Sequence, residues 1–462
     1  MSPNHAKRVL ITGATGLIGK KLSLRFFQLG YEIHALTRDT EKASGSCFFP
    51  IKYFEWHPER EPAPAKAFEN VDIVIHLAGE SVASSRWTSE RKKKILNSRV
   101  TGTRNLISTL SKLSIKPKVL VSSSAIGIYG DRGQESLNEE SQAGTGFLAD
   151  VCKKWEEEAL KAESSTIRSV IIRTGIVLDP EGGALAQMLP IFRLGLGGPI
   201  GDGLSWMSWI HIDDLVEMIV YAATIPSIKG PINGVSPEAC TNKEFTKALS
   251  KSIGMPALFP VPAIMLKIIF GEMSDILLAS QKITPDVALK NSFKFEYRTI
   301  SSALDSLINT AGKGSHRLKQ AAWIPHDKKT VFNFFAEAEN LESITPPWLN
   351  FKITHKSEPQ IKSGLLLDYQ LKIKKIPVKW RTLIEDWQPS EHFVDKQIKG
   401  PYSLWVHRHT FTDLFGGTLV EDTVDYKLPF GLLGQLAHSL FVKSDLNKIF
   451  NYRARVILEK FK

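Results

Sequence analysis

The 462-residue chain has few cysteines and no long hydrophobic run, and each shortage excludes a class of protein. The three cysteines, Cys47, Cys152 and Cys240, lie far apart and lack the spacing of metal ligands. This argues against a disulfide framework and fits a reducing cytosol. The most apolar later stretch, 261–270, is short and contains Lys267, so it predicts no transmembrane helix. A strand pattern begins within about ten residues of Met1, which leaves too little room for a signal peptide.

The bulk composition describes a globular protein of more than one domain. Hydrophobic residues make up 43% and charged residues 23% of the chain, and its length predicts two or three domains. The net charge is +11, but the basic residues are scattered among acidic ones. This favours a solvated basic surface over nucleic-acid binding. We therefore expect a cytoplasmic protein with no nucleic-acid partner, of unknown oligomeric state.

The N-terminal part is organised around residues 9–19, an apolar run that breaks into three glycines and continues with helical spacing. A buried strand, a glycine turn and a helix in this order are typical of a dinucleotide-binding site. Gly13 permits the tight turn, Gly16 lets the backbone approach a pyrophosphate, and Gly19 lets the helix pack against the strand. The helix N-terminus offers free N–H groups to the phosphates. The predicted cofactor contacts from this segment are Gly13, Thr15, Gly16, Leu17, Ile18 and Gly19.

The end of the second predicted strand, 32–37, indicates which cofactor binds. An NAD site places Asp or Glu there to hold the ribose 2′-hydroxyl, whereas this chain has Thr37 and Arg38 followed by Asp39. A hydroxyl and a guanidinium suit a 2′-phosphate, so we predict NADP. In the alternative, Arg38 is merely solvated and Asp39 binds the ribose. The next strand, 71–79, ends in further predicted contacts: Leu77, Ala78, Gly79 and Glu80.

Several motifs resemble those of extended short-chain dehydrogenases/reductases. They are the glycine turn, His-Leu-Ala-Gly at 76–79, Val-Ser-Ser-Ser-Ala at 121–125 with Tyr129-Gly130, Arg-Thr-Gly at 173–175 and Trp-Ile-His-Ile-Asp-Asp at 209–214. Stretches at 79–80, 86–88, 98–99, 146–148, 155–156, 195–201, 208–211, 242–245 and 271–273 resemble the branch called the epimerase family, which includes the human short-chain reductase family 39U member. The resemblance implies an α/β Rossmann domain at 1–244 that binds NADP(H). A small helical, DUF1731-like subdomain would follow at 245–305.

The superfamily's chemistry uses a Ser or Thr and a Tyr-x-x-x-Lys pair on one helix face. The lysine lowers the pKa of the tyrosine, which then moves a proton while hydride passes to or from the nicotinamide. Ser124 matches the serine of this set. The helix expected to carry the pair has no tyrosine, since Ala149 and Asp150 stand four residues before Lys153 and Lys154. This departure puts standard oxidoreduction in question.

Other residues extend the predicted site. Tyr129, or a desolvated Asp150, would be the proton donor; alternatively the domain binds NADP(H) without turnover. Arg99 is a predicted contact to a cofactor phosphate or an anionic substrate, with a surface salt bridge as the alternative. Arg173 and His211 are predicted to line a substrate pocket, and a hydrogen-bonded core histidine is the alternative for His211.

A polar, glycine-containing stretch at 306–316 predicts a linker. Beyond it, at 317–462, the pattern predicts a helix at 328–338 and alternating strands at 365–373, 378–387, 393–398, 402–411 and 417–427. A long helix follows from about Leu432. This α+β pattern, with the motifs at 327–332, 340–341, 345–346, 400–402 and 407–409, resembles the helix-grip fold of START-related, polyketide-cyclase-like (SRPBCC) proteins.

That resemblance implies an apolar ligand held between the sheet and the terminal helix. The candidate lining residues are Trp348, Trp380, Trp387, Trp405, Phe411 and Phe415. A filled core without a ligand is the alternative. His407 and His409 share one strand face, which alone predicts no metal site.

Together these features predict an NADP(H)-dependent oxidoreductase or epimerase for a small carbonyl or sugar-nucleotide-like substrate, with an appended hydrophobic-ligand domain. The alternative is a non-catalytic NADP(H)-sensing or lipid-binding protein, which the missing tyrosine and lysine favour.

Overall fold

A computed structural model describes residues 7–462, and the chain divides into two compact units. The first domain contains the chain up to residue 46 together with 51–307, and the second contains 47–50 and 308–462. Residues 1–6, on which the prediction about a signal peptide partly rests, lie outside the described residues.

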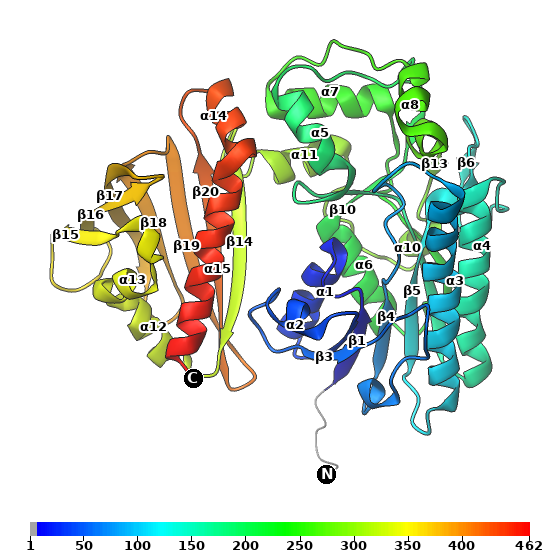
Figure 1. Ribbon diagram of the computed structural model, residues 1–462, viewed down its shortest axis with the longest axis horizontal. Helices are drawn as coiled ribbons and strands as arrows, with labels where there is room; N and C mark the ends of the chain where they lie inside the picture. Colours follow the sequence, from blue (N-terminus) through cyan, green and yellow to red (C-terminus); the bar gives the residue numbers. More distant parts are fainter. Residues whose placement is uncertain (1–6) are drawn as a thin grey trace. The chain divides into compact units, whose positions relative to one another are not determined.

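The first domain is built on a parallel seven-stranded sheet in the order β11-β7-β5-β4-β1-β2-β3 (Figure 1). Its strands are β1 Arg8–Thr12, β2 Glu32–Thr37, β3 Lys52–Glu55, β4 Ile73–His76, β5 Val119–Ala125, β7 Arg168–Thr174 and β11 Gly230–Gly234. These strands are largely apolar because helices cover both faces of the sheet. β1 pairs with β2 on one side and with β4 on the other. The glycine turn after β1 therefore lies at a topological switch point, where ligands bind in open α/β sheets.

Helices pack on the two faces of this sheet. Helices α1 Leu17–Gln28 and α6 Ile212–Thr224 contact each other, and so do α3 Ser89–Lys112 and α4 Phe147–Leu160, which lie side by side in Figure 1. The other helices are α2 Thr40–Ser44, α5 Gly183–Arg193, α7 Asn242–Ile253, α8 Ala263–Phe270, α9 Asp275–Leu278, α10 Asp286–Lys290 and α11 Ile300–Ile308. Short strand pairs are β8 Ile176–Leu178 with β10 Trp209–His211, β9 Trp206–Met207 with β12 Cys240–Thr241, and β6 Ser136–Leu137 with β13 Lys282–Ile283.

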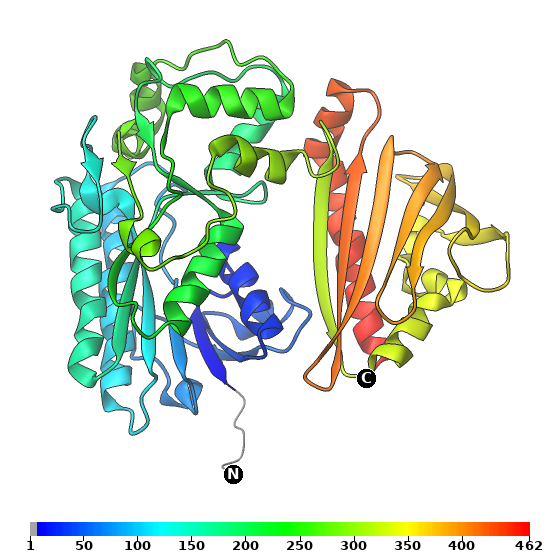
Figure 2. The ribbon, with the colours of Figure 1, turned by 180° about the vertical axis from the view of Figure 1, so that it is seen from behind.

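The second domain is an antiparallel seven-stranded sheet in the order β14-β20-β19-β18-β17-β16-β15 (Figure 2). Its strands are β14 His316–Ile324, β15 Lys352–Lys356, β16 Leu366–Ile373, β17 Ile376–Gln388, β18 His392–Lys399, β19 Leu404–Leu414 and β20 Gly417–Lys427. Helix α15 Lys443–Lys460 packs Leu446 and Phe450 against Trp405, Val424 and other apolar side chains of the sheet. The predicted antiparallel sheet with a long terminal helix is confirmed.

Two predicted helices differ in detail. The helix expected at 328–338 is two helices, α12 Lys328–Ala336 and α13 Ala338–Ile344, because the backbone is extended at Glu337. The terminal helix begins as α14 Leu432–Ala437 and passes through a π-helical segment, His438–Val442, before α15. Within residues 7–462, no helix is long and apolar enough to cross a membrane.

Candidate functional site

The glycine turn leaves no room for side chains beside the backbone. Gly13 has a φ of +74°, and a Cβ there would lie 3.1 Å from the carbonyl carbon of Leu77. A Cβ on Gly19 would lie 2.1 Å from the Gly13 carbonyl oxygen, so only glycine fits. Gly16 is the N-cap of α1 and places no side chain on the first-turn N–H groups. The open helix N-terminus therefore suits an anion such as a pyrophosphate. The other predicted contacts in the turn are Thr15, which is exposed, and Leu17 and Ile18, which are half-buried.

A buried hydroxyl and imidazole join the ends of β1 and β4 beside this turn. Thr12 Oγ1 lies 2.8 Å from His76 Nδ1 and accepts hydrogen bonds from the backbone N–H groups of Leu77 and Ala78. His76 Nε2 lies 3.0 Å from Thr103 Oγ1. Burial lowers the pKa of His76 to about 4, so the ring is neutral at physiological pH. These bonds fix the strand end that carries the predicted contacts Leu77 and Ala78.

The end of β2 presents an exposed guanidinium and a carboxylate that caps a helix. Thr37 is half-buried at the last position of the strand, and Arg38 is exposed. Asp39 is the N-cap of α2, where its Oδ1 accepts a hydrogen bond of 2.8 Å from the Lys42 backbone N–H. One carboxylate oxygen of Asp39 is therefore already used within the protein.

Arg99 fixes the loop that follows β4. Its guanidinium donates to the backbone oxygen of Glu80 at 2.9 Å and stacks over the Trp155 ring at 5.1 Å. It also lies against Gly79, where a Cβ would meet the guanidinium carbon at 3.3 Å. The Glu80 carboxylate pairs with Arg91 at 2.8 Å. Arg99 therefore does not form a surface salt bridge, which was the alternative role predicted for it.

A buried network surrounds Ser124 at the end of β5. Its hydroxyl donates to Glu156 Oε1 at 2.6 Å, and Arg173 holds the same carboxylate through two hydrogen bonds of 3.0 and 2.9 Å. The Tyr129 hydroxyl donates to Asn233 Oδ1 at 2.8 Å and accepts from Arg173 at 2.9 Å. Burial raises the pKa of Tyr129, although the Arg173 charge opposes the shift. The sequence reasoning missed Glu156, because only tertiary packing brings it to Ser124.

The α4 face beside the serine strand has an apolar residue and a thiol where a Tyr-x-x-x-Lys pair would lie. Gly127, which follows β5, packs against Leu148 and Cys152 of α4. A Cβ built on Gly127 would lie 3.3 Å from the Leu148 Cβ and 4.0 Å from the Cys152 sulfur. Leu148 and Cys152 are four residues apart and thus share this face. Burial raises the pKa of Cys152 to about 11. Neither side chain can replace the tyrosine or the lysine at neutral pH.

Lys153 and Lys154, the two lysines considered for a Tyr-x-x-x-Lys pair, lie elsewhere on α4. Lys154 is exposed, and Lys153 pairs with Asp150 at 2.9 Å. Asp150 is itself exposed. The hypothesis of a desolvated Asp150 as proton donor is therefore wrong, because water and Lys153 surround its carboxylate.

His211 is buried at the N-terminus of α6. Its Nδ1 accepts a hydrogen bond of 3.1 Å from the Asp213 backbone N–H, and its Nε2 lies 3.2 Å from Ser306 Oγ. The ring stacks on Tyr297 with centroids 3.7 Å apart. His211 therefore has the contacts of a hydrogen-bonded core histidine, which was the alternative to a role in a substrate pocket.

The sheet order gathers most of the predicted residues at one edge. The glycine turn, Arg38 and the segment 77–80 follow β1, β2 and β4, while Ser124 and Arg173 each lie one residue before the end of their strands, β5 and β7. The carboxyl ends of neighbouring parallel strands meet at the same edge. The structure thus brings the phosphate-binding turn and the serine network to one side of the sheet, and it places His211 on a separate strand pair.

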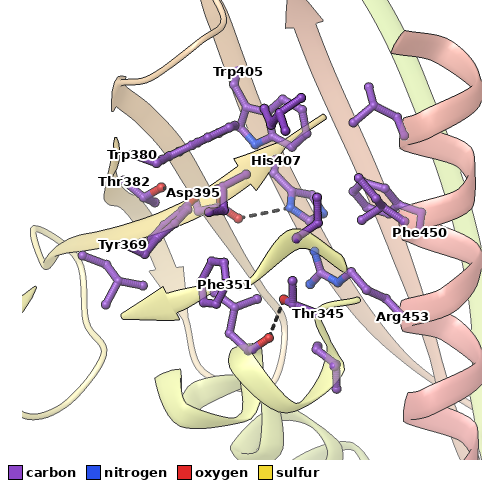
Figure 3. Close-up of a pocket in the computed structure, with 18 of the residues that line it drawn as sticks. Thr345, Phe351, Tyr369, Trp380, Thr382, Asp395, Trp405, His407, Phe450 and Arg453 are labelled. Carbon is purple, nitrogen blue, oxygen red and sulfur yellow. Dashed lines mark hydrogen bonds and ion pairs between the residues drawn. The ribbon is translucent and has the colours of Figure 1, made fainter. Parts of the chain in front are cut away.

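The second domain contains a partly open cavity of about 600 Å³ between its sheet, α13 and α15. Figure 3 shows aromatic side chains such as Tyr369 and Trp405 with polar groups of Thr382, Asp395 and His407 among them. This volume and mixed lining are typical of small-molecule sites. The alternative of a completely filled core is wrong.

Three of the six predicted lining residues border this cavity: Trp348, Trp380 and Trp405. The prediction is wrong for the other three. Trp387 and Phe411 pack on Phe332 of α12, with ring centroids 4.9 and 5.1 Å apart, at another part of the sheet. Phe415 lies in the turn between β19 and β20 and is partly exposed.

Family models match three consecutive segments of the chain. Residues 9–232 match the NAD dependent epimerase/dehydratase family, and residues 261–307 match a domain of unknown function, DUF1731. Residues 324–448 match the family "Polyketide cyclase / dehydrase and lipid transport".

Relatives with this first domain come from plants, animals and bacteria. The epimerase family protein SDR39U1 homolog, chloroplastic, of Arabidopsis thaliana is 39% identical over 303 residues, which are 65% of this chain and 86% of the relative. A crystal structure of human SDR39U1 (isoform 2) with NADPH has 29% identity and a TM-score of 0.57, covering 65% of this chain and 98% of that chain. The nucleoside-diphosphate sugar epimerase of Corynebacterium glutamicum has 33% identity and a TM-score of 0.54, covering 65% of this chain and 58% of that chain.

The predicted resemblance to both families is confirmed. The chain belongs to the SDR39U1 epimerase family of NAD(P)-dependent epimerase/dehydratase proteins and carries an additional polyketide-cyclase-type domain.

Proposed function

We propose that this chain is an NADP(H)-dependent oxidoreductase or epimerase acting on a small carbonyl or sugar-nucleotide-like substrate. The observation that carries the proposal is the turn between Gly13 and Gly19, which excludes side chains in front of the open N-terminus of α1. A choice of NADP is supported by the exposed Arg38 and by the use of Asp39 as a helix cap. The NADPH in the structure of the human relative agrees with this choice.

The proposed residues at the reacting end are Ser124 and Glu156. A bound nicotinamide would supply or accept hydride at its C4 atom. In the direction of oxidation, Ser124 Oγ would take the proton of the substrate hydroxyl while its own proton passes to Glu156 Oε1, toward which it already donates at 2.6 Å, and the substrate hydride would go to the nicotinamide. Reduction of a carbonyl would reverse both transfers. Arg173 would hold the carboxylate in place. In this proposal Tyr129, which is buried behind Arg173, positions the guanidinium and does not touch substrate.

One observation favours a second candidate function. The α4 face beside the serine strand carries Leu148 and Cys152 rather than a tyrosine and a lysine. A domain that binds NADP(H) without turnover, as a sensor of the cofactor or of a lipid, would need neither. The two candidates differ in whether hydride is transferred.

The second domain is proposed to bind an apolar small molecule in its cavity of about 600 Å³. It would deliver or shelter a substrate for the first domain. The proposed compartment is the cytoplasm, which agrees with three free cysteines, two of them buried.

Transfer of deuterium from C4-deuterated NADPH to a panel of carbonyl compounds tests the proposal. We expect transfer by the wild type and a rate lower by about 10²- to 10⁴-fold in Ser124→Ala. Ser123→Ala is the matched control, because successive residues of β5 point to opposite faces. NADPH binding without transfer to any compound would favour the sensor instead, and transfer at equal rates in the two variants would refute the proton-carrying role of Ser124.

A further inference from the structure

Two histidines and two aspartates come together on three neighbouring strands of the second domain. His407 and His409 are alternate residues of β19 and so share one face of the sheet. Asp395 of β18 lies opposite His407, and Asp422 of β20 lies opposite His409. Asp395, His407 and His409 line the cavity, and Figure 3 shows the Asp395 carboxylate directed at the His407 ring.

The three cavity-lining residues have their ligand atoms at the separations that a metal ion requires. Asp395 Oδ2 lies 3.2 Å from His407 Nδ1 and 3.3 Å from His409 Nε2. One ligand atom from each residue lies within 4.8 Å of the others. With metal–ligand bonds of about 2.0–2.1 Å, neighbouring ligand atoms of a tetrahedral site are about 3.3 Å apart.

The remaining carboxylate faces the opposite side of both rings. Asp422 Oδ1 lies 3.4 Å from His407 Nε2 and 2.6 Å from His409 Nδ1. A histidine that binds a metal through one ring nitrogen usually gives the proton of the other nitrogen to a carboxylate or carbonyl, which orients the ring. Asp422 stands where such an orienting group is needed.

The cluster brings two carboxylates and two imidazoles together in a buried part of the second domain, beside a cavity that Arg453 also lines. Both histidines are 3% exposed, and their ring centroids are 3.8 Å apart. A divalent cation balances both carboxylates while the imidazoles stay neutral.

We propose that Asp395, His407 and His409 bind a divalent transition-metal ion, of the class of Zn²⁺, in the wall of this cavity. Asp422 orients both imidazoles from behind. Three protein ligands leave a coordination position open toward the cavity, as in catalytic metal sites. An oxygen atom of a bound cavity ligand would occupy that position. The proposal is independent of the NADP(H) chemistry of the first domain.

Metal analysis of the full-length, untagged protein tests this assignment. The protein is stripped with a chelator, incubated with excess Zn²⁺, dialysed and analysed by plasma mass spectrometry. A parallel sample is loaded with Co²⁺, whose visible absorption reports four-coordinate binding. We expect about one Zn²⁺ per wild-type chain and the absorption of a Co²⁺ site with nitrogen and oxygen ligands.

The variants separate the ligands from the orienting residue. His407→Asn and Asp395→Asn should lose the ion, and Asp422→Asn should bind it roughly 10- to 100-fold more weakly. His392→Asn is the matched control, since His392 pairs with Asp386 at 2.8 Å on the same sheet and should leave Zn²⁺ binding unchanged. Wild-type protein that binds neither Zn²⁺ nor Co²⁺ would overturn the proposal. This test uses the wild type alone, so it holds even if a variant fails to fold. Equal Zn²⁺ content in His407→Asn, His392→Asn and the wild type would also overturn it.

Discussion

Replacing Glu156 with Gln probes the buried ion pair that holds Ser124. Arg173 and Glu156 are 9% and 8% exposed, and the guanidinium makes two hydrogen bonds to the carboxylate. Gln keeps the shape of the side chain but removes its charge, which leaves a buried guanidinium without its counter-charge. Breaking a buried pair on one side costs about 3–5 kcal/mol. Because the Tyr129 hydroxyl and the Glu139 carbonyl still accept from Arg173, we expect the lower end of this range, about 3 kcal/mol.

Thermal unfolding of the full chain, followed by calorimetry, measures this loss in the transition of the first domain. For a large domain, 1 kcal/mol shifts the midpoint by about 2–4 °C, so we expect a decrease of roughly 6–12 °C. Glu217→Gln is the control, because Glu217 pairs with Arg25 on the surface, with side chains 45% and 36% exposed. Surface pairs contribute about 1 kcal/mol or less. A decrease for Glu156→Gln no larger than that for Glu217→Gln would refute the reasoning.

Three further predictions concern the turn, the buried histidine and the cavity. Gly19→Ala places a Cβ 2.1 Å from a backbone oxygen and should weaken NADPH binding at least about tenfold in a fluorescence titration. Gly45→Ala should not, because its Cβ would meet only the Lys42 carbonyl oxygen, at an ordinary contact distance of 3.9 Å. The pKa of His76 falls from 6.5 to about 4 on folding, so the unfolded chain takes up the proton first and stability is lost as the pH falls from 6.5 toward 4. Urea unfolding should show roughly 2 kcal/mol of this loss at pH 5, and an unchanged stability there would contradict it. Leu371→Trp, which reduces the cavity, should weaken binding of an apolar fluorescent probe at least about threefold, while Ile376→Trp on the surface should leave it unchanged.

The phosphate-binding turn could be predicted because its requirements are local. A positive φ at Gly13 and the close approach at Gly19 depend on a strand, a turn and a helix that are consecutive in the chain. The bounds of β2 and β20 were predicted to the residue for a similar reason, since breaks in the apolar pattern mark both ends. The glycine turn and the bounds of these two strands could therefore be predicted from residues that are consecutive in the chain.

The serine network could not be predicted because it depends on how α4 is rotated against the sheet. Counting back from Lys153 and Lys154 assumed that one of these lysines faces Ser124, whereas the packed helix directs Cys152 and Glu156 toward that strand. Helical periodicity shows which residues share a face but not which face meets the sheet. Only the tertiary structure decides this.

The same limit applies to the second domain. Strand alternation places His407 and His409 on one face, but the aspartates that face them come from two other strands. Their approach depends on the cross-strand register, which the spacing of His407 and His409 does not contain. Likewise, alternation does not show which end of the sheet contains the cavity, and Trp387 and Phe411 were assigned to it wrongly.

Binding of NADPH and NADH to the wild type and to Arg38→Ala, measured by calorimetric titration, tests the central claim most directly. Charge-assisted hydrogen bonds contribute about 1.5–3 kcal/mol, so the wild type should bind NADPH at least about tenfold more tightly than NADH. Arg38→Ala should lose this difference through weaker NADPH binding alone, and Lys42→Ala, a change of a nearby exposed cation, should retain it. Equal affinity of the wild type for the two cofactors, or an undiminished preference for NADPH in Arg38→Ala, would contradict the account.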